Sequence, residues 1–99
     1  MTNERRNELD DIGKALKSRS GRRMLWRLLE FAGVFHSTFS TDAMVMAFNE
    51  GKRAQGLMLL ADIHAVDPDG YILMAKEAKA RQEAKEAERE RNSNGSESE

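Results

Sequence analysis

Two histidines, His36 and His64, are the side chains of this sequence best suited to bind a metal or to move a proton near neutral pH. Asp62 and Asp67 lie near His64 in the sequence, but Asp62 is two residues away and so faces another side of a helix. The chain has no cysteine and no HExxH pattern, which excludes cysteine-ligated zinc and the commonest histidine-ligated zinc motif. The sequence therefore predicts no metal site and no cofactor.

Hydroxyl groups gather beside His36, where a nucleophile would need an adjacent general base. The same residue types are also the ordinary composition of a loop. Paired acidic residues lie at positions that suit helix caps and exposed turns, whereas acid–base catalysis favours burial. We therefore predict no catalytic residue and no enzyme. The hydroxyl cluster comprises Ser37, Thr38, Ser40 and Thr41, and the acidic pairs are Asp10 with Asp11 and Asp67 with Asp69.

The stretch from residue 13 to residue 29 is basic and holds no acidic residue, although the whole chain has a formal net charge of −1. Two interpretations stay open for this stretch. Its cations could contact nucleic-acid phosphates, or they could form a solvated face that pairs with acidic residues of neighbouring helices. The four arginines proposed for nucleic-acid binding are Arg19, Arg22, Arg23 and Arg27.

The elements that position these side chains are predicted to be helices, because apolar residues recur at intervals of three and four. The expected ranges are 4–17, 21–32, 43–66 and a fourth helix that begins at Pro68. Thr2 or Asn3, Ser18 or Ser20, and Thr41 or Asp42 are the expected caps of the first three helices, Asp67 is the expected cap of the fourth, and Gly33 is expected to end the second in the left-handed conformation.

A chain of 99 residues makes one domain at most, and a core this small is marginal without a partner. We expect an all-α fold, a small bundle of three to four helices over residues 1–75. Residues 76–91 alternate in charge and are expected to form a charged C-terminal helical extension, and residues 92–99 a disordered acidic tail. No apolar run approaches the roughly 20 residues of a membrane span, so no membrane contact is expected.

The second and third helices are predicted to be the packed pair. Gly51 and Gly56 each cost roughly 1 kcal/mol within a helix, and close approach of another backbone would offset that cost. Alternatively, Gly56 breaks the third helix into two. The expected core residues are Leu25, Trp26, Leu29, Phe48 and Met58, and Met44, Ala47 and Gly51 are also expected to face inward. A charged network of Arg27, Glu30, Glu50 and Arg53 is expected to set the register of the pair.

The loop from residue 34 to residue 41 contains Phe35 and Phe39. Aromatic residues in a connection either fold back over the core or mark a contact surface. Both interpretations stay open, and Phe35 and Phe39 are the candidate contacts for a protein partner.

Three blocks of this sequence occur in an order that closely resembles the Bbp-nineteen-like phage domain family. They are GRRMLWRLLEFAGVF from Gly21, FNEGKR with GLMLLADI from Phe48, and Asp67-Pro68 with Tyr71. The resemblance covers residues 10 to 76, and it implies a phage origin and a gene often found near head and portal genes. It implies no catalytic residue, because the role of the family is poorly characterised.

From these observations we expect a small phage protein in the host cytoplasm, or incorporated in the virion. It would act as a virion-associated or head and portal morphogenesis accessory that binds other phage structural proteins, or copies of itself. The alternative is a nucleic-acid-binding accessory that uses the basic stretch 14–27.

Overall fold

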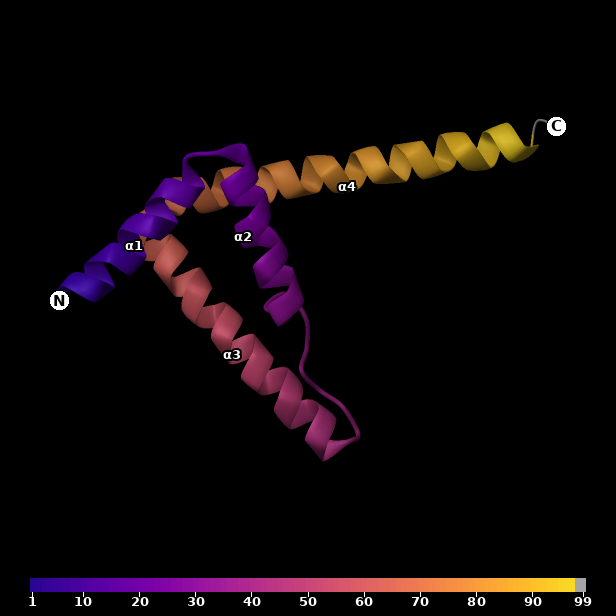
Figure 1. Ribbon diagram of the computed structural model, residues 1–99. Helices are drawn as coiled ribbons and strands as arrows, with labels where there is room; N and C mark the ends of the chain where they lie inside the picture. Colours follow the sequence, from indigo (N-terminus) through magenta and orange to yellow (C-terminus); the bar gives the residue numbers. More distant parts are fainter. Residues whose placement is uncertain (98–99) are drawn as a thin grey trace.

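The computed structural model describes residues 1–97, and these residues form four helices (Figure 1). The helices are α1 (Asn3–Leu16), α2 (Arg19–Ala32), α3 (Ala43–Val66) and α4 (Pro68–Glu97). The predicted all-α fold is confirmed, and the predicted bounds of α3 match residue for residue. The sequence predicted helix only as far as residue 91, whereas α4 continues to Glu97. Residues 98–99 of the predicted tail lie outside the described residues.

Each helix begins where a side-chain oxygen accepts backbone N–H groups that have no partner within the helix. The Thr2 hydroxyl accepts from Arg5 at 3.1 Å, and the Ser18 hydroxyl accepts from Gly21 at 2.9 Å. The other two oxygens belong to carboxylates: Asp42 accepts from Met44 and Val45, and Asp67 accepts from Gly70. Gly33 ends α2 in the left-handed region at φ 78°. Local sequence therefore sets these boundaries as predicted.

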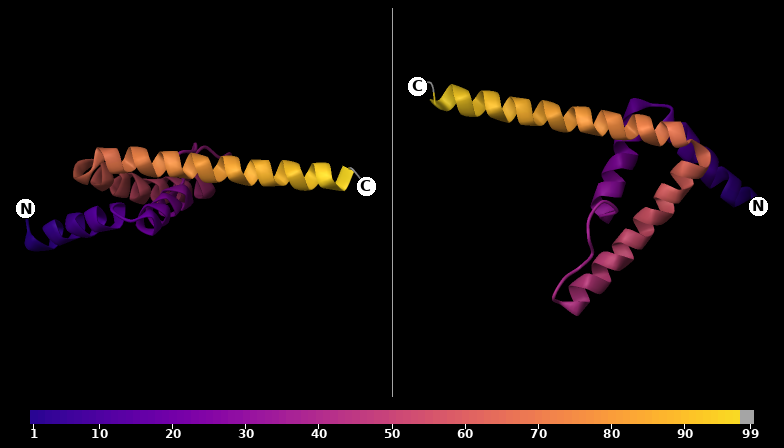
Figure 2. Two further views of the ribbon diagram at one scale, coloured as in Figure 1. Left: turned by 90° about the horizontal axis from the view of Figure 1, so that it is seen from above. Right: turned by 180° about the vertical axis from the view of Figure 1, so that it is seen from behind.

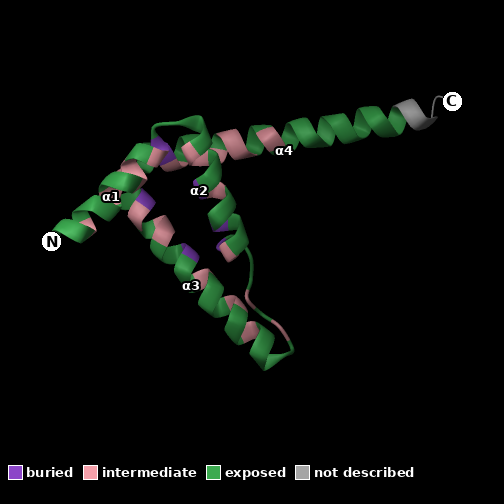
Figure 3. Cartoon of the chain, viewed as in Figure 1, coloured by how far each residue is buried: buried purple, intermediate pink, exposed green. Residues whose placement is uncertain are grey.

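The core lies where all four helices meet, and it is small. Three side chains in it, Leu29, Ile63 and Met74, are almost completely buried and come from α2, α3 and α4. Figure 3 shows that the buried positions cluster at this junction, while residues 43–45 of α3 and 82–94 of α4 are exposed. The six buried apolar residues of the described chain are Leu16, Leu25, Leu29, Val34, Ile63 and Met74.

The predictions that Phe48 and Met58 belong to the core are wrong: 68% of Phe48 and 65% of Met58 are exposed. Met44, Ala47 and Gly51, which were also expected to face inward, are exposed as well. The reason is geometric, because α2 is ten residues shorter than α3 and ends near the middle of that helix (Figure 1). The first half of α3 therefore has no helix to pack against. Trp26, also expected in the core, is half-buried at its edge.

Gly56 lies where α3 crosses α2, and the helix is continuous through it. A Cβ atom at this position would overlap the Cβ of Ala32 and would lie 2.6 Å from Cγ1 of Val34. The predicted close approach is thus confirmed for Gly56, and the alternative of a broken helix is wrong. At Gly51 a Cβ would meet nothing within 4 Å, so packing within this chain does not require that glycine.

The molecule is a thin, extended layer, with principal extents of 64 × 39 × 16 Å. Its radius of gyration is 17.6 Å, compared with about 13 Å for a compact domain of 100 residues. Figure 2 shows why: the second half of α4 extends away from the other helices in both views. None of the described helices is both long enough and apolar enough to cross a bilayer.

Candidate functional site

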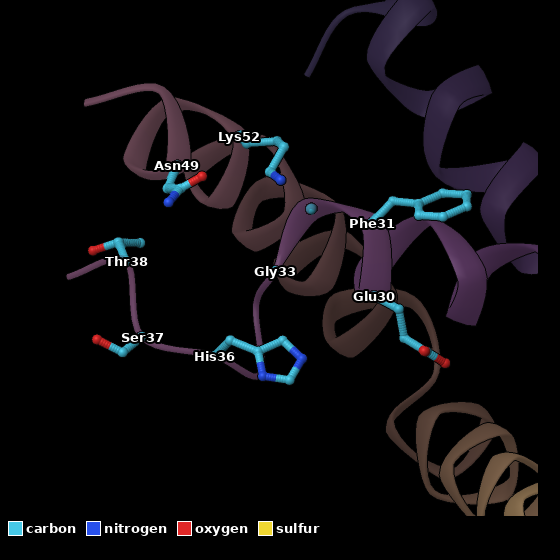
Figure 4. A pocket seen from close by; sticks show the side chains of 9 residues that line it. Glu30, Phe31, Gly33, His36, Ser37, Thr38, Asn49 and Lys52 are labelled. Carbon is cyan, nitrogen blue, oxygen red and sulfur yellow. The ribbon is translucent and has the colours of Figure 1, made fainter. Parts of the chain in front are cut away.

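A cavity is lined by three of the residues considered for catalysis, His36, Ser37 and Thr38. It has a volume of about 230 Å³ and lies between the end of α2, the following loop and the first half of α3 (Figure 4). In Figure 4 the hydroxyl groups of Ser37 and Thr38 point away from the imidazole of His36. The Ser37 hydroxyl accepts the backbone N–H of Phe39 at 3.1 Å, which is a loop-stabilising role. The described geometry therefore aligns no hydroxyl with this histidine.

His64 lies on α3, where its Nδ1 atom is 2.9 Å from the carbonyl oxygen of Leu60. Its ring packs against Tyr71, with the two ring centroids 4.6 Å apart. Among the described residues, no cluster of three or more histidine, cysteine or acidic side chains is arranged to hold a metal ion. His64 thus contributes to the contact between α3 and α4.

The two loop phenylalanines have different surroundings. Phe35 folds back and stacks on Trp26, with ring centroids 4.9 Å apart and an interplanar angle of 26°. Phe39 lies at the far end of the loop and is 77% exposed. Of the two candidate contacts for a partner, Phe39 therefore presents the whole ring, while Phe35 presents one edge of an aromatic cluster that includes Trp26 and Tyr71.

Two of the four arginines proposed for nucleic acid are held by a carboxylate. Arg22 donates to both oxygens of Glu77, at 2.6 and 3.1 Å, and also to the carbonyl oxygen of Leu16. Arg19 lies 3.3 Å from the same carboxylate. The hydrogen bonds from Arg22 hold the pKa of Glu77 below its ordinary value of 4.5, against the opposing effect of burial. This cluster joins α2 to α4, so Arg22 is a structural residue.

A second ion pair joins the first turn of α1 to α3. The guanidinium of Arg5 donates to both carboxylate oxygens of Asp62, one of them at 3.1 Å, and also contacts Glu8. The roles of Arg5, Asp62 and Glu77 in these ion pairs were not predicted from the sequence. One signal was available for Glu77, because it follows Met74 by three residues and so lies on the buried side of α4.

The four residues of the predicted charged network between α2 and α3 are not joined by ion pairs in the described chain. None of the ion pairs among the described residues joins Arg27, Glu30, Glu50 or Arg53. Arg27, Glu30 and Glu50 are not held by one another, and the Nε atom of Arg53 is buried without a hydrogen bond. The interhelical ion pairs instead tie α1 to α3 and α2 to α4, and Gly56 sets the contact between α2 and α3.

The remaining two arginines of the basic stretch, Arg23 and Arg27, line an open groove between α2 and α4. The groove has a volume of about 450 Å³. Arg81 and Lys85 line it from α4, the aromatic rings of Trp26 and Phe31 form part of its wall, and Glu30 is its one acidic lining residue. We call Arg23, Arg27, Arg81 and Lys85 the basic groove. The groove is thus lined by four cations and one carboxylate, and this excess of positive charge favours an anionic ligand.

Exposed apolar side chains outnumber the buried ones in the described chain. Apart from Met1, they fall on three elements besides the loop: one face of α2, the first two-thirds of α3, and the start of α4. Scattered surface apolar residues are normal, but contiguous ones mark interaction sites. The exposed residues are Met24, Leu28 and Phe31 on α2, Phe35 and Phe39 in the loop, Met44, Val45, Phe48, Leu57 and Met58 on α3, and Ile72 and Leu73 on α4.

Comparison with known proteins gives one match. A family model described as Bbp19-like phage protein matches residues 14–76, which is more than half of the chain. The matched region includes the crossing of α2 and α3 at Gly56 and ends near Glu77. No curated protein and no solved structure matches the chain.

Proposed function

We propose that this chain, which belongs to the Bbp19-like phage protein family, is an accessory protein of the virion or of head and portal morphogenesis. It would act by binding other phage structural proteins, without catalysis, in the host cytoplasm or within the particle. The family membership identifies a small phage protein, and the role in assembly is our inference from the surface.

The observation that supports binding is the imbalance between buried and exposed apolar side chains. Six are buried in the described chain, against the larger exposed set on α2, the loop, α3 and α4. A domain of this size is marginal even when compact, and the radius of gyration of 17.6 Å shows that this one is extended. Burial of the exposed set against a partner would supply the apolar contacts that the chain alone does not make.

Mass spectrometry of purified virions and of assembly intermediates tests the proposal. We expect the chain to co-sediment with particles or with procapsids, and nuclease treatment should not release it. Double substitution of Phe39 and Phe48 by serine should reduce this association, because both rings are exposed and their removal leaves the core intact. Absence of the chain from every particle and intermediate would contradict the proposal.

The basic groove supports a second candidate function, binding of nucleic-acid phosphates. Removal of a phosphate-binding cation should weaken binding to all nucleic-acid sequences and reduce the salt dependence of the affinity. We expect a salt-dependent mobility shift with DNA or RNA that the double variant Arg23→Ala and Arg27→Ala weakens. Arg89→Ala, at an exposed position of α4 outside the groove, is the matched control. Equal binding by the two variants would exclude the groove.

A further inference from the structure

The outward face of α3 carries a stripe of uncharged residues over the first two-thirds of the helix. Met44, Phe48, Gly51, Gln55 and Met58 follow one another at intervals of four, three, four and three residues. This is the spacing of a seam between two helices. Ala47 and Ala54 flank Gly51 on the same side of the helix, and all seven residues are exposed. We call these seven residues the α3 stripe.

Gly51 is the residue of the stripe that this chain leaves unexplained. A glycine within a helix is less favourable than alanine, and close approach of another backbone is the usual compensation. At Gly56 that compensation is visible, since Ala32 and Val34 occupy the space of a Cβ. At Gly51 a Cβ would meet nothing within 4 Å. The stripe therefore has the composition of a close helix contact and no contact within the chain.

The positions of the stripe are spaced symmetrically about Gly51, and the outermost pair is also alike in residue type. Met44 and Met58 are each seven residues from it, and Ala47 and Gln55 are each four residues from it. Phe48 and Ala54 are each three residues from it, so a large ring on one side corresponds to a small side chain on the other. A twofold axis at Gly51 would thus bring each residue of one antiparallel helix opposite its counterpart in a second copy.

We propose that two copies of this chain pair through antiparallel α3 stripes centred on Gly51. This inference rests on the proposed function, in which the chain acts through protein contacts, and it names a second copy as the occupant of this face. Glu50 and Arg53 of the same part of α3 lie off the stripe. The Lys52 ammonium lies 5.5 Å from the centroid of the Phe48 ring and so places a cation at the edge of the seam. Phe48 of one copy would pack beside the small residues of the other.

The area of the contact limits its strength. From Met44 to Met58 the helix rises about 21 Å at 1.5 Å per residue. One helix face of that length is smaller than the roughly 800 Å² per partner of a standard interface. We therefore expect a weak, exchanging dimer, with a dissociation constant between about 1 μM and 1 mM, which higher local concentration in an assembly would favour.

The chain contains no natural cysteine, so a disulfide in a single-cysteine variant can form only between the introduced residues of two copies. A disulfide needs Cα atoms about 4.4–6.8 Å apart, and helices packed at small residues approach to axial distances near 8 Å. Under mild oxidation, Gly51→Cys should cross-link to itself. A mixture of Met44→Cys and Met58→Cys should give the mixed dimer, whereas neither of these two variants should cross-link alone. Glu83→Cys, on the exposed part of α4, is the matched control and should stay monomeric.

Sedimentation of the unmodified chain should show a concentration-dependent dimer, and Phe48→Glu should abolish it without loss of helix content by circular dichroism. A chain that stays monomeric up to about 1 mM, above the dissociation constants near which weak pairs form, would overturn the inference. Preferential cross-links between Met44→Cys copies, which indicate parallel helices, would also overturn it.

Pairing of two copies and association with phage particles can be refuted independently of each other. A monomeric chain that still co-sediments with particles refutes the pairing alone, and if Phe48→Glu then no longer binds the particles, the stripe contacts another phage protein. A dimeric chain that is absent from particles and intermediates refutes the assembly role alone.

Discussion

Replacement of each α3 glycine by alanine should move stability in opposite directions. Gly51 and Gly56 lie five residues apart in the same helix, so both substitutions give the same gain in helix propensity, about 1 kcal/mol. They differ in what the new Cβ meets. The space around Gly51 is open, while Ala32 and Val34 fill the space beside Gly56.

The magnitudes follow from these contacts. Gly51→Ala should raise the free energy of unfolding of the monomer by nearly the full propensity term, about 0.8–1.0 kcal/mol. At Gly56 the new Cβ would lie 2.6 Å from Val34 Cγ1 and closer to Ala32, compared with about 3.5–4.0 Å for an optimal carbon contact. Overpacking of this kind costs about 1–3 kcal/mol, and two overlapping atoms favour the upper value. The gain in helix propensity, about 1 kcal/mol, offsets part of this cost. Gly56→Ala should therefore lower the free energy of unfolding by about 2 kcal/mol.

Thermal unfolding followed by circular dichroism measures both changes. For a domain of 60–100 residues, 1 kcal/mol corresponds to about 4–8 °C in Tm. We therefore expect Gly51→Ala to melt several degrees above the natural chain and Gly56→Ala about 8–16 °C below it. The Tm values of the natural chain and the two variants should be compared at low protein concentration, where pairing through the α3 stripe does not contribute. If Gly56→Ala proves as stable as Gly51→Ala, the close crossing of α2 and α3 is refuted.

Two further predictions concern the core and the α2–α4 ion pair. Leu29→Ala should destabilise the chain by about 2–5 kcal/mol, because Leu29 is fully buried, while Phe48→Ala should change monomer stability by less than about 0.5 kcal/mol; denaturant titration of the two variants separates these values. The folded pKa of Glu77 lies below its unfolded value, so its contribution is present above pH 4.5 and is lost as the pH falls through the folded pKa. Glu77→Gln should flatten the decline of Tm in this acidic range, and an unchanged pH profile would show that the pair with Arg22 does not form.

The exposed apolar residues explain why part of the core was mispredicted. Leu29 and Phe48 have the same kind of neighbours in the sequence, and both fit an apolar helix face. Leu29 is buried because α3 and α4 both reach it, while Phe48 lies beyond the last residue of α2. Helix periodicity defines a face, but the length of the partner helix determines how much of that face is covered.

The ion pairs show a similar limit. Sequence analysis placed Arg53 in a charged network that includes Glu50, three positions away in the same helix. In the fold Glu77 pairs with Arg22, 55 positions earlier, and Arg53 has no ion pair among the described residues. Long-range pairs depend on the angles at which helices cross, and no local pattern encodes those angles.

Sequence alone determined the helical class, the family and the capping residues at the helix starts, because caps, glycine and proline act on the few residues beside them. The end of α4 at Glu97 was not predicted. Tertiary structure alone decided that Gly56 is a crossing point while Gly51 is open, that Arg22 is held by Glu77 while Arg23 and Arg27 are not, and that half of α3 is uncovered. These outcomes depend on which helices contact one another, because a side chain is buried only where another element packs against it.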